Sequence, residues 1–570
     1  MPTSIEFSTL LKSLRIVNFP LKNLKIEPLG SDSKVPRQVL KNHLSLVEPT
    51  LTDKRKLCSV NLKFIKTELM EGDADENDSV EVQMDQNAID VLSGKTAFES
   101  SPSYSYCYGG HQFGSWAAQL GDGRAIAIAQ TMSRKNHLWE WQLKGAGMTP
   151  YSRFADGWAV TRSSIREYLC AEFAYALGIP TSRSLSLITT DQNVQREVQE
   201  KAAIVCRMAP SWIRFGNFEI FYARDDIENL QILADYCIEY HFPDILKTSQ
   251  PNVYEQFLSS VVEKTAFMIA QWQATGFCHG VMNTDNFSIL GLTIDYGPFQ
   301  FLDAYDPSYI CNHSDETGRY AFMQQPSAAL FNLVQFATAL SPLLEKENPD
   351  KSVAGICKPL LDKFGPLLKN EYYSRMLLKC GFNPDTLDSF TKSELANAIV
   401  DPLLELMYDC KMDYNLFFRT LSLPIMENDK ELSAETLEKW KACSYLSKDH
   451  VKWTNASDDD DSLESRLAAW FIQYLSALKR SKVLENERME RMKKNNPKYV
   501  LRNYMVQNII DEFDEIETEE DREAAKESLN RYLTILQDPF QEWSESDALM
   551  FGANRLVPTH LQSLKCSCSS

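Results

Sequence analysis

Strand-like residue patterns end near residue 206, and helical patterns dominate the chain after that point. Short apolar runs predict strands at 125–129, 139–144 and 201–206. Apolar residues at helical spacing predict helices at 163–177, 254–275 and 462–480. Strands followed by helices, rather than alternating with them, are typical of the α+β class. We therefore expect a two-lobed α+β body with a helical C-terminal extension.

Local signals add detail to this outline. Ser163 and Ser164 are N-cap candidates for the helix at 163–177. Residues 71–87 are acidic and polar, which predicts an exposed loop. Four consecutive aspartates at 458–461 precede the helix at 462–480, and negative charge there suits the positive end of the helix dipole. We interpret this run as a solvated cap.

Composition excludes several classes of protein. The 570 residues include 59 basic and 78 acidic side chains, a net charge of −19, which disfavours binding to nucleic acid or anionic membranes. No run of 18 apolar residues occurs, so we expect no membrane span. The 13 cysteines are irregularly spaced and form no Cys-x2-Cys pair, which argues against a disulfide scaffold or a structural zinc site.

The N-terminus allows two interpretations. Residues 7–19 carry Lys12 and Arg15 among spaced apolar residues, as a short mitochondrial presequence does. The segment is short, however, and Glu6 adjoins it. Taken alone, these residues favour the alternative that the segment is the first element of the fold.

A glycine-rich turn is the first of four motifs with chemical meaning. Gly121, Gly123 and Arg124 lie just before a predicted strand. Glycines let a backbone approach a phosphate closely, and Arg124 adds positive charge. By itself, such a cluster is more often a plain turn.

The second motif pairs Lys144, at the end of a predicted strand, with Glu167, which lies 23 residues later in a predicted helix. Protein kinases hold nucleotide phosphates with a strand lysine and a helix glutamate in this order. Either residue alone would more simply be a surface charge.

The third and fourth motifs are HGVMNTDN at 279–286 and IDYG at 294–297. Asn286 and Asp295 could supply the hard oxygen ligands that Mg²⁺ prefers. The order of all four motifs is far more specific than any one of them, and it predicts a nucleotide site.

Two features depart from the kinase pattern. Kinases place the catalytic aspartate five residues before the metal-binding asparagine, where this chain has Val281, which cannot accept a proton. Asp285 stands instead beside Asn286. Arg207 and Arg214 add two guanidinium groups suited to phosphate oxygens, and Asp156-Gly157 adds a tight turn.

Long stretches of the chain resemble the selenoprotein O family, also called YdiU-type protein adenylyltransferases, from about residue 14 to the C-terminus. The matching segments are YGGHQFGSWAAQLGDGR (108–124), QLKGAGMTPYSR (142–153), RSSIREY (162–168), HGVMNTDN (279–286), IDYGPF (294–299), CNHSD (311–315) and PKYVLRN (497–503). The resemblance implies a pseudokinase fold, ATP bound in a flipped orientation, and Mg²⁺ (or Mn²⁺)-dependent transfer of AMP to Ser, Thr or Tyr hydroxyls of proteins.

The resemblance also implies roles and boundaries. Asp285 would be the proton acceptor, Asn286 and Asp295 the metal ligands, and Glu167 the partner of Lys144. The expected nucleotide contacts are Gly121, Gly123, Arg124, Lys144, Asp156, Gly157, Arg207, Arg214 and Asp295. The expected divisions are an N-terminal extension (1–95), an N-lobe (96–222), a C-lobe (223–400) and a helical extension (401–570).

Two positions differ from the family pattern. Trp158 stands where an arginine is usual, which leaves the nearby charge open, and Gln300 stands where a glycine is usual. Neither position has an assigned role.

The resemblance extends to the cysteines. The family's selenocysteine, where present, is third from the end, which is Cys568 here, so the chain is similar to the cysteine-containing form. Cys311 matches the family's redox partner, with Cys566 as a resolving thiol, although the thiols could also be unrelated. The family's eukaryotic members are mitochondrial, so the resemblance favours a mitochondrial location, with a cytoplasmic one as the alternative.

Two other functions compete with adenylyl transfer. One is a phosphotransferase, against which Val281 argues. The other is a catalytically dead nucleotide-binding scaffold, against which the intact Asp285, Asn286 and Asp295 argue.

Overall fold

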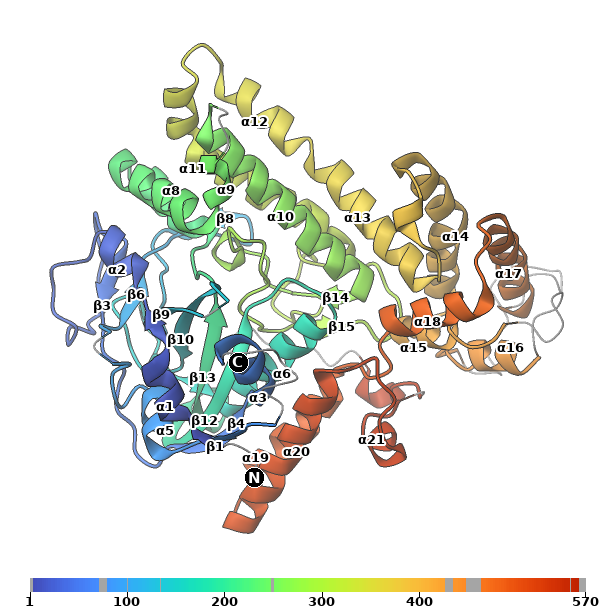
Figure 1. Ribbon diagram of the computed structural model, residues 1–570, viewed down its shortest axis with the longest axis horizontal. Coiled ribbons are helices and arrows are strands. Elements are labelled where there is room, and N and C mark those ends of the chain that lie inside the picture. Colours follow the sequence, from blue (N-terminus) through green and yellow to red (C-terminus); the bar gives the residue numbers. More distant parts are fainter. Residues whose placement is uncertain are drawn as a thin grey trace.

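The computed structural model describes residues 4–70, 79–99, 101–133, 135–247, 251–425, 434–446, 463–553 and 555–562. Strands gather in the first part of the chain and helices make up most of the rest (Figure 1). The expected α+β class is confirmed. The chain places one large sheet beside a helical half, and the last helices return to the sheet.

The sheet has nine strands, and every neighbouring pair in it is antiparallel. Its main order is β3 (Leu44–Leu46), β6 (Tyr104–Tyr106), β9 (Ala125–Met132), β10 (Leu138–Lys144), β13 (Gln199–Ala209), β12 (Arg183–Gln195) and β4 (Lys56–Val60). The short strands β2 (Arg15–Ile16) and β11 (Ala159–Val160) pair with β9 and β13. The predicted strands at 125–129, 139–144 and 201–206 are confirmed as parts of β9, β10 and β13.

The first 95 residues are built into this sheet. They supply β2, β3 and β4, and helix α1 (Phe7–Ser13) buries Phe7, Leu10 and Leu11. A separate parallel pair joins β1 (Ser4–Glu6) to β5 (Glu81–Gln83). The loop predicted at 71–87 is wrong for β5, because strand pairing with β1 outweighs its polar composition, and for residues 86–87, which begin helix α5 (Gln86–Leu92). Residues 71–78 lie outside the described ranges.

Helix α6 (Thr161–Ala176) crosses the sheet and packs against β12 and β13. It begins two residues before Ser163, so the predicted N-caps are wrong. The N-cap position is Val160, whose side chain makes no capping bond, and Ser163 Oγ instead donates to the Val160 carbonyl at 3.1 Å. Strand β11 leads directly into the helix, and this connection fixes where the helix starts.

The helical half follows β13. Its helices are α7 (Phe215–Ala223), α8 (Ile227–His241), α9 (Pro243–Lys247), α10 (Val253–Thr275), α11 (Gln325–Glu347), α12 (Val353–Leu361), α13 (Phe364–Lys379), α14 (Ser389–Asp409), α15 (Tyr414–Thr420), α16 (Ala434–Lys441) and α17 (Leu463–Arg480). The predicted helices at 254–275 and 462–480 are confirmed as α10 and α17. The aspartates at 458–461 lie outside the described residues.

One described helical stretch, Phe322–Glu347, is long and apolar enough to cross a membrane. More than half of its apolar window, 56%, is buried inside the protein, where α11 packs against α7 and α10. A buried core helix passes the same test, so this stretch is weak evidence for a span.

The final helices return to the sheet. After α18 (Glu485–Asn495), helices α19 (Asn503–Asp514) and α20 (Glu519–Leu536) pack against α6, and α20 also contacts β4 (Figure 1). The short α21 (Glu545–Met550) follows. Helix α6 is thus enclosed between the sheet and the C-terminal helices.

Candidate active site

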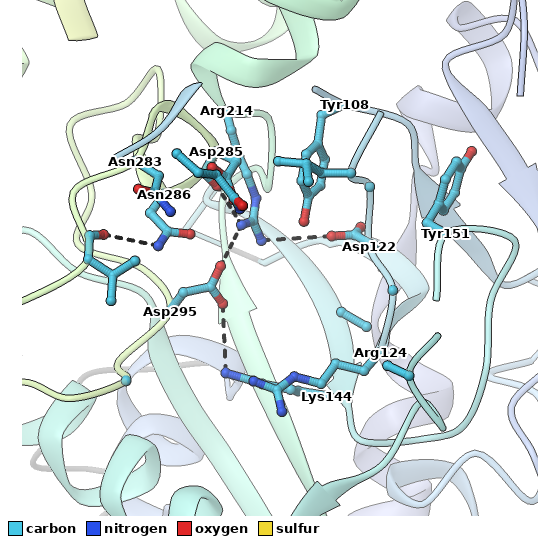
Figure 2. Close-up of a pocket in the computed structure, with 18 of the residues that line it drawn as sticks. Tyr108, Asp122, Arg124, Lys144, Tyr151, Arg214, Asn283, Asp285, Asn286 and Asp295 are labelled. Carbon is cyan, nitrogen blue, oxygen red and sulfur yellow. Dashed lines mark hydrogen bonds and ion pairs between the residues drawn. The ribbon is translucent and has the colours of Figure 1, made fainter. Parts of the chain in front are cut away.

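A cavity of about 450 Å³ lies where the ends of the sheet strands meet the loops of the helical half. Figure 2 shows side chains from both halves turned toward this space. The cavity brings together most of the residues that the sequence singled out: Gly121, Gly123, Arg124, Lys144, Arg207, Arg214, Asp285, Asn286 and Asp295.

The glycine-rich turn precedes β9 and packs on Tyr151. A Cβ at Gly121, whose φ is +84°, would lie 2.4 Å from the Tyr151 ring, and one at Gly123 would lie 2.9 Å from the Tyr151 carbonyl oxygen. Both positions therefore exclude larger side chains. The close packing leaves the backbone of the turn, and Arg124 beside it, at the cavity wall.

Lys144 and Glu167 form the ion pair that their order in the sequence predicts. Lys144 Nζ lies 2.5 Å from Glu167 Oε2, and Arg207 Nη1 donates to Glu167 Oε1 at 2.8 Å. Burial alone would raise the pKa of Glu167, but Lys144 and Arg207 together lower it. Glu167 is thus held ionised behind the cavity wall and fixes both cations.

Three cations converge on Asp295. Arg207 donates to its carboxylate. Arg214 also donates to it, and Lys144 Nζ lies 3.8 Å from its Oδ1 (Figure 2). Burial disfavours the ionised form of Asp295 and would raise its pKa, but these cations hold the pKa well below the ordinary value. The inner end of the cavity therefore has fixed positive groups that could bind phosphate oxygens.

Arg214 also connects this cluster to the loop that carries Asp285. Its Nη1 donates to the Asp285 carbonyl oxygen at 2.7 Å, and its Nη2 lies 3.7 Å from Asp122 Oδ1. Asp122 is buried, and burial raises its pKa to about 6 although Arg214 opposes the shift. No residue pattern signals this role of Asp122, even though it lies within the glycine-rich motif.

Asp285 has the environment of a general base. Its side chain is buried and its Oδ1 has no partner among the described residues, while Gln112 Nε2 donates to its Oδ2 at 3.2 Å. Burial raises its pKa to about 6, against the opposing effects of Arg214 and Gln112. A base with a pKa near the working pH is well matched to proton transfer. Val281 lies in the same wall and offers no such group.

Asn286 and Asp295 form a donor set that fits Mg²⁺. Asn286 Nδ2 donates to the Val281 carbonyl at 3.0 Å, which fixes the amide and leaves its oxygen as an acceptor (Figure 2). An amide oxygen beside a carboxylate suits a hard divalent cation. His279 has a supporting role, since its buried ring stacks on Trp272 and contacts the Ile294 carbonyl at 3.0 Å.

Asp156 and Gly157 do not line the cavity. Asp156 pairs instead with Arg196 at 2.8 Å and accepts a bond from the Trp158 amide. Trp158 packs on a small apolar cluster beside the sheet. Arg196 therefore places a positive charge next to the position where this chain has Trp158 instead of the usual arginine.

The remaining sequence-derived residues lie away from the cavity. Cys311 is buried, and its Sγ lies 3.5 Å from the Cys278 carbonyl, while Cys566 and Cys568 fall outside the described residues. Gln300 is buried, accepts hydrogen bonds from Tyr309 and Asn503, and so connects the IDYG segment to α19.

Known proteins resemble this chain over most of its length. A family model described as protein adenylyltransferase SelO matches residues 52–533. A relative from Thiobacillus denitrificans, named protein nucleotidyltransferase YdiU, is 42% identical over 425 residues, which cover 74% of this chain and 78% of the relative. Proteins of the same name from Variovorax paradoxus (41% over 489 residues; 85% and 87% covered) and Flavobacterium johnsoniae (38% over 542 residues; 92% and 95% covered) are also similar. The chain therefore belongs to the SelO family of protein adenylyltransferases.

Proposed function

We propose that this protein transfers AMP from ATP to Ser, Thr or Tyr hydroxyls of other proteins. The observation that carries this proposal is the convergence of Lys144, Arg207 and Arg214 on Asp295 at the inner end of the cavity. These cations can hold the terminal phosphates deep in the cavity, which leaves the α-phosphate toward Asp285. The names of the family and of the relatives support the same chemistry.

The proposed fold is that of a pseudokinase, with lobes at 96–222 and 223–400. The antiparallel sheet, Lys144 at the end of β10, Glu167 in the next helix and the two polar loops in the helical half support this assignment. Residues 401–570 form the proposed helical extension, and residues 1–95 the N-terminal one.

In the proposed step, an acceptor hydroxyl oxygen attacks the α-phosphorus of ATP. A new P–O bond forms, the bond between the α-phosphorus and the bridging oxygen breaks, and pyrophosphate leaves. The hydroxyl proton passes to Asp285, whose raised pKa of about 6 leaves it ionised at neutral pH yet able to accept a proton.

Asn286 and Asp295 are the proposed ligands of Mg²⁺, or of Mn²⁺ in its place. When bound, such a cation neutralises charge on the phosphate oxygens. Asp295 would hold the cation through its carboxylate, to which Arg207 and Arg214 also donate.

Mass spectrometry of modified acceptor protein tests the proposal. An AMP adduct on a hydroxyl side chain, absent when Asp295 is replaced by Ala, is the expected result. A phosphate adduct alone would instead support the phosphotransferase.

Two further properties are proposed from the resemblance. A reversible Cys311–Cys568 disulfide would make the rate redox-dependent. The second property is a mitochondrial location. The buried side chains of α1 support the alternative that this segment is the first element of the fold. Imaging of the tagged full chain tests the location.

A further inference from the structure

A second cavity, of about 200 Å³, lies beside the C-terminal ends of α6 and α10. It is bounded by the C-terminal ends of α6, α10, α13 and α18, and α13 packs directly against α18 (Figure 1). It shares no lining residue with the cavity of the candidate active site.

The charge of this second cavity is opposite to that of the whole chain. Arg375, Lys379 and Lys494 line it, and none of the described lining residues is Asp or Glu. The chain as a whole carries a net charge of −19. The negative ends of helix dipoles favour nearby cations, which explains how three of them can gather here.

Lys379 is the central residue of this cluster. It is only 4% exposed, and no described carboxylate acts on the pKa of its ammonium. Its Nζ lies 4.5 Å from the Phe418 ring centroid and 5.3 Å from that of Tyr414. Burial lowers the pKa of Lys379 to about 7. A buried cation without an anion is costly, and ring faces offset only part of that cost.

Three other donor side chains line the same cavity as Lys379. Asn415 is 3% exposed, and its Nδ2 has no hydrogen-bond partner among the described residues. Lys494 makes no ion pair within the described chain, whereas its neighbour Lys493 lies 3.7 Å from Glu490. Arg375 binds Glu371 through Nε at 2.8 Å, and its two Nη groups make no hydrogen bond to a described residue. The cavity thus brings four donor side chains together, and none of its described lining residues is a carboxylate.

We propose that this cavity binds a small phosphate-type anion, either inorganic phosphate or a phosphomonoester, through Lys379, Lys494, Asn415 and Arg375. Its volume admits a phosphate group with a small substituent. Such a ligand gives the buried ammonium its missing partner and contacts α13, α15 and α18 together. It therefore links the C-terminal extension to the helical half.

Equilibrium dialysis with radiolabelled inorganic phosphate tests this proposal. The full chain is used at constant ionic strength, with a non-hydrolysable ATP analogue saturating the candidate active site. Saturable binding of one phosphate per chain is expected. Lys379→Met keeps the apolar stem and removes the charge, so it should weaken binding by at least about tenfold, the worth of one charged hydrogen bond.

Two further variants make the test specific. Lys494→Met, at the cavity wall, should also weaken binding, and Lys493→Met, one residue away and outside the cavity, should not. Displacement of the label by glycerol 3-phosphate would identify a phosphomonoester as the ligand type, and failure to displace it would identify the free anion. Absence of saturable binding, or equal binding by wild type and a folded Lys379→Met, would overturn the proposal.

Discussion

Gln112 donates a hydrogen bond to the carboxylate of Asp285, from Nε2 to Oδ2 at 3.2 Å. Gln112 belongs to a short hairpin of β7 (His111–Gln112) and β8 (Ser115–Trp116). The hairpin is held on the same loop by the His111 amide, which donates to Thr284 Oγ1 at 2.7 Å. The carboxylate proposed to accept the proton is thus oriented by a segment from the other half of the molecule.

Gln112→Leu should lower turnover roughly tenfold, because a hydrogen bond to a charged group contributes about 1.5–3 kcal/mol. Asp285 must be ionised to act, so activity should fall as the pH drops through about 6. The bond from Gln112 lowers the pKa of Asp285, so its loss in the variant should raise that pKa. The fall in activity on the acid side of the pH–rate profile should therefore move to higher pH. A pH–rate profile measures both effects. Ser115→Ala, in the exposed β8, is the matched control, and an unmoved acid limb would argue against positioning by Gln112.

Asp285→Asn should lower turnover by roughly 10²–10⁴, the usual contribution of a general base, while ATP affinity is largely kept. The amide preserves the shape of the side chain but cannot accept the proton. Single-turnover rates and nucleotide titration separate the two quantities. A parallel loss of ATP affinity would point to a binding or folding role instead.

Glu167→Gln should lower the free energy of unfolding by about 3–5 kcal/mol, because it leaves the cations of Lys144 and Arg207 buried without a full counter-charge. Denaturant unfolding measures the change. Glu200→Gln removes the partner of Arg162, a more exposed pair, and should cost about 1 kcal/mol or less. Equal losses in the two variants would mean that the buried network does not stabilise the fold.

Oxidation should produce a Cys311–Cys568 disulfide and change the adenylylation rate reversibly. Cys311 is 1% exposed and burial raises its thiol pKa well above the ordinary value, so its segment must open before it reacts, and formation should be slow. Non-reducing peptide mapping and rates before and after reduction measure this. Because Cys278 adjoins Cys311, the mapping is repeated in Cys278→Ser. A Cys278–Cys311 peptide alone, or a rate indifferent to reduction, would refute the regulatory disulfide.

The sequence predicts the parts of the site whose geometry is local. Lys144 and Glu167 meet because one ends a strand and the other lies in the next helix, and the order of motifs reveals that relation. The contact of Gln112 with Asp285 joins residues 173 positions apart, and no residue pattern signals it. The role of Asp122 has no sequence signal for the same reason, since it depends on burial beside Arg214.

The fold shows the same limit. The short apolar run of β9 and the helical spacing of apolar residues in α10 predict these elements, whereas β4 and the contacts of α20 with α6 depend on tertiary pairing. Asp156 and Gly157 match the family motif, yet Asp156 pairs with Arg196 outside the cavity. A motif therefore identifies the residue types of a site better than it identifies their contacts.

Parallel reactions with α- and γ-³²P-labelled ATP test the central claim most directly. Wild type is compared with Asp295→Asn, which removes a proposed metal ligand but keeps the side-chain shape. Transfer of the α-label to acceptor protein by wild type, its loss in Asp295→Asn, and no transfer of the γ-label are the predicted results. Transfer of the γ-label to acceptor protein would contradict adenylyl transfer and would establish phosphoryl transfer in its place.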